Sequence, residues 1–201
     1  MFNNTINQKI NQQLLSGWGR YPRLNCNIVN PVKQDILSDL LDHGPLIARG
    51  LGRSYGDSSL SKTLTVSMAR FNHFLAFEDT TGLLTVEAGV ILKDIVNTFL
   101  PLGWFVPVTP GTKYVTVGGM IAADVHGKNH HHAKSFGHHV LWLDLMTNDG
   151  KIIRCDDANN TLLFKATIGG MGLTGIIIRA CFKLIKIPSA WLKQEVIATA
   201  N

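Results

Sequence analysis

The stretch Arg49-Gly50-Leu51-Gly52-Arg53-Ser54-Tyr55-Gly56-Asp57 directly follows a short apolar run, Leu46-Ile47-Ala48, that has the composition of a strand end. Its three glycines allow the backbone to turn tightly and to bring several N–H groups toward one concave point, which suits an anion such as a diphosphate. The two arginines can add charge-assisted hydrogen bonds to the same anion. The spacing G-x-G-x-x-x-G differs from the G-x-G-x-x-G of a dinucleotide-binding turn. The stretch therefore fits either a phosphate-holding loop or an ordinary glycine-rich turn, and a second signal has to decide.

The residues on either side of this loop alternate between helical and strand patterns. A helix is predicted from Asn30-Pro31, an N-cap and a first-turn proline, to Gly44. Hairpin turns are predicted at 79–82 and 148–150. Short strands with no long parallel-sheet pattern indicate the α+β class. The remaining predictions are strands at 46–48, 63–67, 74–77, 83–87, 105–108, 140–147, 151–154 and 175–187, helices at 89–100 and 160–166, and irregular structure at 16–30.

The bulk composition describes a globular protein. The chain has 201 residues, 45% of them hydrophobic and 16% charged, which excludes a disordered chain and allows a sizeable core. No apolar run approaches the roughly 20 residues of a membrane span. The polar start, residues 1–13, lacks the apolar core of a secretory signal, which predicts a cytoplasmic protein. The net charge of +5 suits an anionic ligand or an acidic membrane surface, whereas the scattered basic residues argue against nucleic-acid binding.

A second glycine motif, Gly170-Met171-Gly172-Leu173-Thr174-Gly175, does match G-x-G-x-x-G. The β-branched run Ile176-Ile177-Ile178 follows it, where a dinucleotide turn requires a helix whose N-terminus faces the pyrophosphate. We interpret this stretch as a glycine-rich turn between a helix and a strand, in preference to a Rossmann site.

The second signal is the segment Pro110-Gly111-Thr112-Lys113-Tyr114-Val115-Thr116-Val117-Gly118-Gly119-Met120-Ile121-Ala122-Ala123-Asp124-Val125-His126-Gly127-Lys128-Asn129-His130-His131. Its small residues around Gly118-Gly119 suit a backbone that lies close against a flat ligand. Together with the loop at 50–57, this segment resembles the FAD-linked oxidases of the vanillyl-alcohol-oxidase superfamily, which carry a PCMH-type FAD-binding domain. Within that superfamily the chain looks most like the decaprenylphosphoryl-β-D-ribose 2-oxidase group, and the similarity runs from about residue 18 to residue 188.

The resemblance implies an α+β domain of two lobes with FAD stretched between them. It divides the chain into a polar N-terminal segment (1–17), a first FAD-binding lobe (18–70), a second lobe (71–188) and a tail (189–201) that leads to a C-terminal substrate domain absent from the chain. It also implies three groups of cofactor contacts. They are Ala48, Arg49, Gly50, Leu51, Gly52, Arg53, Ser54, Tyr55, Gly56, Asp57 and Ser58 around the pyrophosphate; Gly111, Thr116, Val117, Gly118 and Gly119 along the diphosphate and isoalloxazine; and Ala123, Asp124, Val125 and His126 along the flavin, with Ile177 on the adenine side.

The type of flavin attachment also follows from the resemblance. Some relatives bind FAD covalently through a histidine in the first loop, and Arg53 stands at that place here. The resemblance therefore implies non-covalent, dissociable FAD.

Six histidines lie within fourteen positions, between His126 and His139. A metal site is one interpretation, but no H-x-x-x-H pattern lies on an evident helix and no cysteine or carboxylate cluster completes a ligand set, so we predict none. The resemblance places His126, with Lys128, at the substrate face of the flavin, where either could stabilise negative charge as hydride arrives. The alternative for His126 is a backbone hydrogen bond that only shapes the pocket, and for His130 to His132 it is a polar surface loop.

The activity implied by the resemblance is oxidation of a sugar-type secondary alcohol by hydride transfer to flavin. The implied substrate is a sugar or a polyprenyl-phosphate-linked sugar, with a short-chain reductase as partner and a peripheral position on the inner membrane as an alternative location. Such relatives are about twice as long and carry a substrate domain, so this chain is expected to bind FAD but to turn over poorly. The alternatives are a sugar-alcohol or aldonolactone oxidase, and a non-catalytic flavin-binding module.

Overall fold

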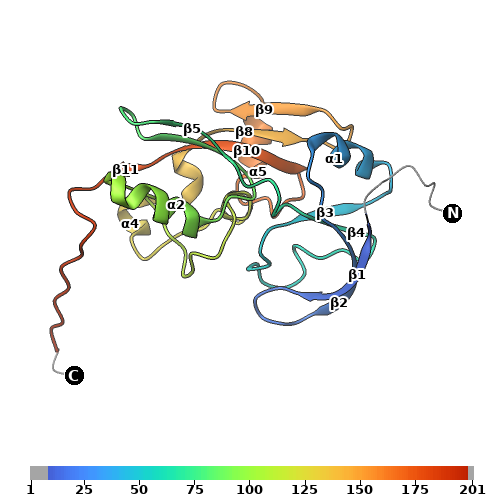
Figure 1. The fold of residues 1–201 in the computed structure, drawn as a ribbon, viewed down its shortest axis with the longest axis horizontal. Coiled ribbons are helices and arrows are strands. Elements are labelled where there is room, and N and C mark those ends of the chain that lie inside the picture. The colour runs from blue at the N-terminus through green and yellow to red at the C-terminus, as the bar shows by residue number, and fades with distance from the viewer. Residues whose placement is uncertain (1–8, 199–201) are drawn as a thin grey trace.

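The protein is described by a computed structural model that covers residues 9–198 (Figure 1). It contains two main β-sheets and several short helices, which confirms the α+β prediction. In chain order the elements are β1 (Asn11–Ser16), β2 (Arg23–Val29), α1 (Gln34–Leu41), β3 (Leu46–Arg49), β4 (Leu64–Ser67), β5 (Phe74–Glu78), β6 (Leu83–Glu87), α2 (Leu92–Phe99), η1 (Leu100–Leu102), β7 (Trp104–Phe105), α3 (Val117–Ala122), α4 (His130–Ala133), η2 (Phe136–His139), β8 (Val140–Met146), β9 (Ile152–Asp156), α5 (Thr161–Thr167), β10 (Ile176–Lys183) and β11 (Ile185–Lys186).

One of the two main sheets has four strands in the order β1-β2-β4-β3. The β1–β2 pair is antiparallel, whereas β4 runs parallel to both β2 and β3. Helix α1 buries Leu37 and Leu40 in a core that includes Val29, Leu64 and Val66 of this sheet. The predicted helix starts too early: α1 begins at Gln34 rather than at the Asn30-Pro31 pair.

The prediction of irregular structure at 16–30 is wrong, because Arg23–Val29 forms strand β2. This strand has the period-two pattern of a sheet with one buried face: Cys26 and Ile28 are buried, while Arg23 and Asn25 are exposed. Its neighbour β1 forms the edge of the sheet and is mostly polar, so it has few apolar residues from which a strand could be predicted. Edge strands of this kind carry a weak sequence signal.

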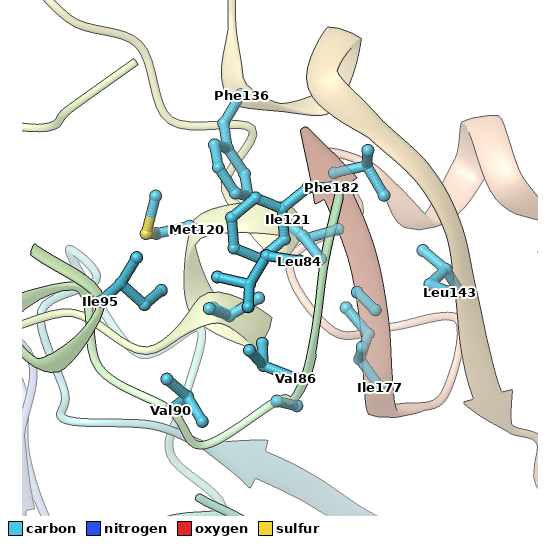
Figure 2. Packing of buried hydrophobic residues seen from close by; sticks show 14 of the residues in the cluster. Leu84, Val86, Val90, Ile95, Met120, Ile121, Phe136, Leu143, Ile177 and Phe182 are labelled. Carbon is cyan, nitrogen blue, oxygen red and sulfur yellow. The ribbon is translucent and has the colours of Figure 1, made fainter. Parts of the chain in front are cut away.

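The other main sheet has five antiparallel strands in the order β5-β6-β10-β8-β9. Both predicted hairpins are confirmed as β5–β6 and β8–β9. Figure 2 shows Met120 and Ile121 of α3 among the buried side chains of β6, β8 and β10, where Leu84 and Phe182 lie. Helix α3 is thus anchored on the inner face of this sheet.

The strand predicted at 105–108 is shorter than expected. Only Trp104–Phe105 forms β7, which pairs with β11. Pro107 lacks the N–H group that a continued ladder would need, so Val106 and Val108 are buried without strand pairing. Among the described residues, no helix combines the length and the apolar character that crossing a bilayer requires.

A buried carboxylate ties together the three strands β9, β8 and β10. Asp144 is 3% exposed and accepts hydrogen bonds from Arg154 Nε at 2.7 Å, from Arg154 Nη2 at 3.0 Å and from Arg179 Nε. The Arg154 guanidinium also lies 3.6 Å from the ring centroid of Trp142. Burial acts to raise the pKa of Asp144, but the hydrogen bonds from Arg154 and Arg179 outweigh it and hold the pKa below the ordinary value of 3.8.

We expect Asp144→Asn to lower the free energy of unfolding by about 1–3 kcal/mol, because two guanidinium groups lose a shared charged acceptor. Since the pKa of Asp144 is lowered by folding, its contribution is present above about pH 4 and is lost as the pH falls through the folded-state pKa. Urea unfolding of both proteins at neutral and acidic pH measures this, and the difference should shrink in acid. Asp157→Asn removes the same charge at an exposed turn and should change little; equal effects of the two variants would contradict the assignment.

Candidate functional site

A cleft lies where the loop after β3, helix α3 and the turn before β10 come together. It spans about 890 Å³, part of which is open solvent. Most of its lining is small or apolar. The lining residues are Ala48, Gly50, Leu51, Gly52, Arg53, Ser54, Ser58, Ser59, Met68, Ala88, Val115, Thr116, Gly118, Gly119, Ala122, Ala123, Val125, Met171, Gly172, Gly175 and Ile177.

The loop after β3 is held in place by the side chain of Arg49. Its Nη2 donates to the carbonyl of Ser16 at 2.8 Å, and its Nη1 donates to Ser59 Oγ at 3.0 Å. Burial lowers the pKa of Arg49, the nearby Cys26 acts to raise it, and the positive charge of Arg53 lowers it further. Gly52 has a φ of +65°, and a Cβ there would lie 2.2 Å from Arg49 Nη2. Arg49 therefore braces the loop from behind and is not one of the cleft's lining residues.

The backbone of this loop offers unused hydrogen-bond donors. The amides of residues 51–56 have no acceptor among the described residues. Helix α3 differs, because the amides of Val117, Gly118 and Gly119 donate to Val90 O, Ala88 O and Thr116 Oγ1 respectively. An anion in the cleft would thus be held by the loop rather than by the first turn of the helix.

Helix α3 has two opposite faces, and its sequence explains both. Its apolar residues face the core that packs on the five-stranded sheet, as Figure 2 shows for Met120 and Ile121, whereas its small residues, with Ala123 just after it, line the cleft. The apolar residues are Val117, Met120 and Ile121, at the spacing of one helical face; the small ones are Gly118, Gly119 and Ala122.

The two glycine-containing segments meet at Gly50 and Thr116. A Cβ on Gly50 would lie 2.2 Å from Thr116 Oγ1, so only glycine permits this approach. Thr116 is also the N-cap of α3, where its Oγ1 accepts from Gly119 N at 3.2 Å. Two segments more than sixty residues apart in the chain thus form adjoining walls of one cleft.

Comparison with known proteins identifies this arrangement. Residues 34–156 match the family model described as "FAD binding domain". The chain belongs to this family of FAD-binding domains. This match spans both the loop after β3 and helix α3.

Individual relatives of this FAD-binding domain are oxidases and dehydrogenases. The chain is 40% identical over 185 residues to a decaprenylphosphoryl-beta-D-ribose oxidase of Mycolicibacterium smegmatis, which covers 88% of this chain and 40% of that protein. It is 32% identical to cytokinin dehydrogenase 3 of Arabidopsis thaliana, over 74% of this chain and 30% of the relative. It is 26% identical to a D-arabinono-1,4-lactone oxidase of Debaryomyces hansenii, over 85% and 34%. The chain thus spans less than half the length of these relatives.

The residues of the cleft fit FAD. The free amides of residues 51–56 suit the diphosphate, because no acceptor among the described residues competes for them. The small-residue face of α3 suits a flat ring system, because no large side chain stands between the ring and the backbone. Apolar side chains such as those of Met68, Val115 and Ile177 also line the cleft and can contact the apolar parts of the cofactor.

Most of the residues implied as cofactor contacts are brought together in this cleft. The structure places there Ala48, Gly50, Leu51, Gly52, Arg53, Ser54, Ser58, Thr116, Gly118, Gly119, Ala123, Val125 and Ile177.

The other implied contacts lie outside the cleft lining. Tyr55 and its neighbours Gly56 and Asp57 are exposed, and so is Gly111. Val117 is buried in the core that packs on the five-stranded sheet. The Asp124 carboxylate accepts the Gly137 amide at 2.8 Å, which makes it a brace between two loops. Arg49 and His126 are the remaining two implied contacts outside the lining.

The structure adds lining residues that the sequence interpretation left out, and the second glycine motif supplies several. This motif is indeed a turn between α5 and β10, as predicted. It also reaches the cleft through Met171, Gly172 and Gly175. The glycines of this motif are the sequence feature that could have pointed to the cleft. Whether the turn reaches the cleft depends on the position of β10 in the sheet, which the motif does not encode. The other additions are Ser59, Met68, Ala88, Val115 and Ala122.

The histidine-rich segment leaves the cleft after Val125 as an exposed turn, which is followed by the short helices α4 and η2. The His126 and His130 ring centroids are 5.6 Å apart, and those of His130 and His131 are 3.9 Å apart. Within residues 9–198, no three histidine, cysteine or acidic side chains are placed so that they could hold a metal ion. Lys128 lies on the same loop and is exposed.

We expect acid precipitation of the FAD-loaded protein to release its yellow colour into the supernatant. The loop that lines the cleft carries Arg53 and contains no histidine or cysteine, and a guanidinium does not form a covalent bond to the flavin. Absorbance of the supernatant and of the redissolved pellet measures the outcome. Flavin that stays with the pellet after denaturation would contradict non-covalent binding.

Proposed function

We propose that this chain is the FAD-binding portion of an oxidoreductase that removes hydride from a sugar-type secondary alcohol. The observation that carries the proposal is the cleft itself, in which free loop amides and a small-residue helix face adjoin. The names of two relatives, a decaprenylphosphoryl-ribose oxidase and an arabinonolactone oxidase, support a sugar-type donor.

In this proposal bound FAD supplies the hydride acceptor. The chain's own residues hold and orient the cofactor: residues 51–56 bind the diphosphate through their amides, and α3 presents Gly118 and Gly119 to the ring system. The apolar residues Met68, Val115 and Ile177 exclude water from the enclosed side of the cleft.

The proposal assigns His126 and Lys128 to the substrate side, on the loop that continues from the cleft-lining Val125. Either side chain, when protonated, would stabilise negative charge that develops on the ring system. The substrate proposed for the complete enzyme is a polyprenyl-phosphate-linked sugar, with a short-chain reductase acting on the product.

Anaerobic addition of a sugar alcohol or aldonolactone to the FAD-loaded chain tests the proposal. We expect slow single-turnover bleaching of the flavin band, and we expect His126→Ala to slow it by about tenfold or more with FAD still bound. Lys134→Ala, an exposed change in the same segment, is the control and should not alter the rate. Absence of bleaching with every such donor would favour a non-catalytic flavin-binding module, and an unchanged rate in the variant would remove His126 from the reacting site.

A further inference from the structure

A second open cleft adjoins the FAD cleft along residues 51–53. It spans about 1020 Å³, part of which is open solvent, and is formed by the end of β1, the turn at 17–20 and the segment 49–53. Three residues line both clefts, so this segment is the wall between them. They are Leu51, Gly52 and Arg53.

The charged residues that line this second cleft are all positive. Arg20, Arg49 and Arg53 line it, and no acidic residue does. Arg49 is occupied with Ser16 and Ser59, as described above. The guanidinium groups of Arg20 and Arg53 form no hydrogen bond or ion pair with any residue between 9 and 198. Two cations with free donors therefore share a cleft without a counter-charge.

The walls of the cleft are fixed before any ligand arrives. The Trp18 amide donates to the carbonyl of Ser54 at 2.8 Å, which joins the 17–20 turn to the FAD loop. A Cβ on Gly17 would lie 2.4 Å from that same carbonyl, so the two segments are in close contact. The guanidinium of Arg53 lies 5.4 Å from the Trp18 ring centroid, which restricts its direction. The pKa of Arg49, lowered first by burial, is lowered further by Arg53, a repulsion that a bound anion would relieve.

The rim of the cleft is apolar. Leu14 is 61% exposed and Trp18 is 53% exposed, so both side chains are accessible to a ligand in this cleft. A ligand that is charged at one end and apolar at the other would use both features.

We propose that this second cleft is a phosphate-ester site, in which Arg20 and Arg53 hold the phosphate while Leu14 and Trp18 contact an apolar group attached to it. Guanidinium forks match phosphate oxygens in pairs, which makes two unpartnered arginines a better phosphate site than a site for a monovalent anion. The inference that a phosphate ester binds here stands on the cleft alone. Its assignment to the lipid-linked sugar substrate rests on the proposed function.

The test uses the FAD-loaded chain and isothermal titration with geranyl phosphate, geraniol and inorganic phosphate. Arg20 is the residue to change because, unlike Arg53, it lines only the second cleft. Its φ of +58° makes asparagine the suitable replacement, since asparagine tolerates the left-handed region. Arg70→Asn removes the same charge at an exposed position outside both clefts and is the matched control.

We expect geranyl phosphate to bind the wild type at least tenfold more tightly than geraniol. Arg20→Asn should weaken that binding at least tenfold with the FAD absorbance unchanged, and Arg70→Asn should have no effect. Inorganic phosphate that binds as tightly as geranyl phosphate, and depends on Arg20 equally, would support the anion site with free phosphate as the ligand but remove the apolar contact. No binding of either phosphate, or equal binding by Arg20→Asn, would overturn the proposal. Loss of FAD in the wild type would instead count against the proposed function, and it is measured first.

Discussion

Replacing Gly119 with leucine is expected to reduce FAD affinity at least a hundredfold while leaving the fold intact. Gly119 lies on the cleft face of α3, and a Cβ there would meet only Thr116 Oγ1, at 3.1 Å. The rest of the leucine side chain would extend into the space where we place the flat part of the cofactor. Leucine is also a better helix former than glycine by about 0.5–1 kcal/mol. The variant should therefore lose FAD without losing stability.

Titration of the apoprotein with FAD, followed by flavin fluorescence, measures the affinity of the Gly119→Leu variant, and circular dichroism melting measures its stability. Ala158→Leu adds the same kind of side chain at an exposed turn outside the cleft and should bind FAD like the wild type. Wild-type affinity in Gly119→Leu would mean that the cofactor does not pass over this face of α3.

Replacing Gly52 with alanine is expected to have the second large effect, through the shape of the loop rather than by filling the cleft. Alanine at a φ of +65° costs about 1–2 kcal/mol. In addition, its Cβ would overlap the Arg49 guanidinium, which braces the loop against Ser16 and Ser59. Moving Arg49 would disturb the loop backbone that carries the free amides of residues 51–56. We expect FAD affinity to fall by at least tenfold and the melting temperature to fall as well.

Gly56→Ala is the matched control for the Gly52 variant. Gly56 also has a positive φ, +60°, but a Cβ there would have no neighbour within 4 Å. In the control, the only cost is that of placing alanine at a positive φ. The difference in FAD affinity and melting temperature between the two variants therefore measures the effect of the contact with Arg49. The same fluorescence titration and thermal melting compare them. Equal losses in the two variants would show that Arg49 does not position the loop.

Much of the local structure could be predicted from the sequence, because it depends on neighbouring residues. The hairpins β5–β6 and β8–β9 follow from alternating apolar residues around turn sequences. Such patterns failed at two places. The strand predicted at 105–108 ends early because Pro107 has no N–H for a strand partner, and β1 was missed because an edge strand is polar. The composition of the first glycine-containing segment left a phosphate-holding loop and an ordinary turn open; FAD was implied by the resemblance that both segments carry, and the family match agrees with it.

The sequence by itself thus determined the α+β class and the two segments that form the cleft, because glycine spacing and apolar periodicity are local properties. Only the tertiary structure decided which side chains face that cleft. In the structure, the Arg49 side chain contacts Ser16 and does not line the cleft, and Val117 is buried in the core. Met171 and Gly172 line the cleft although they lie in a turn that is distant in sequence. These outcomes depend on contacts between residues far apart in the chain, such as Gly50 against Thr116, and no local pattern encodes such contacts.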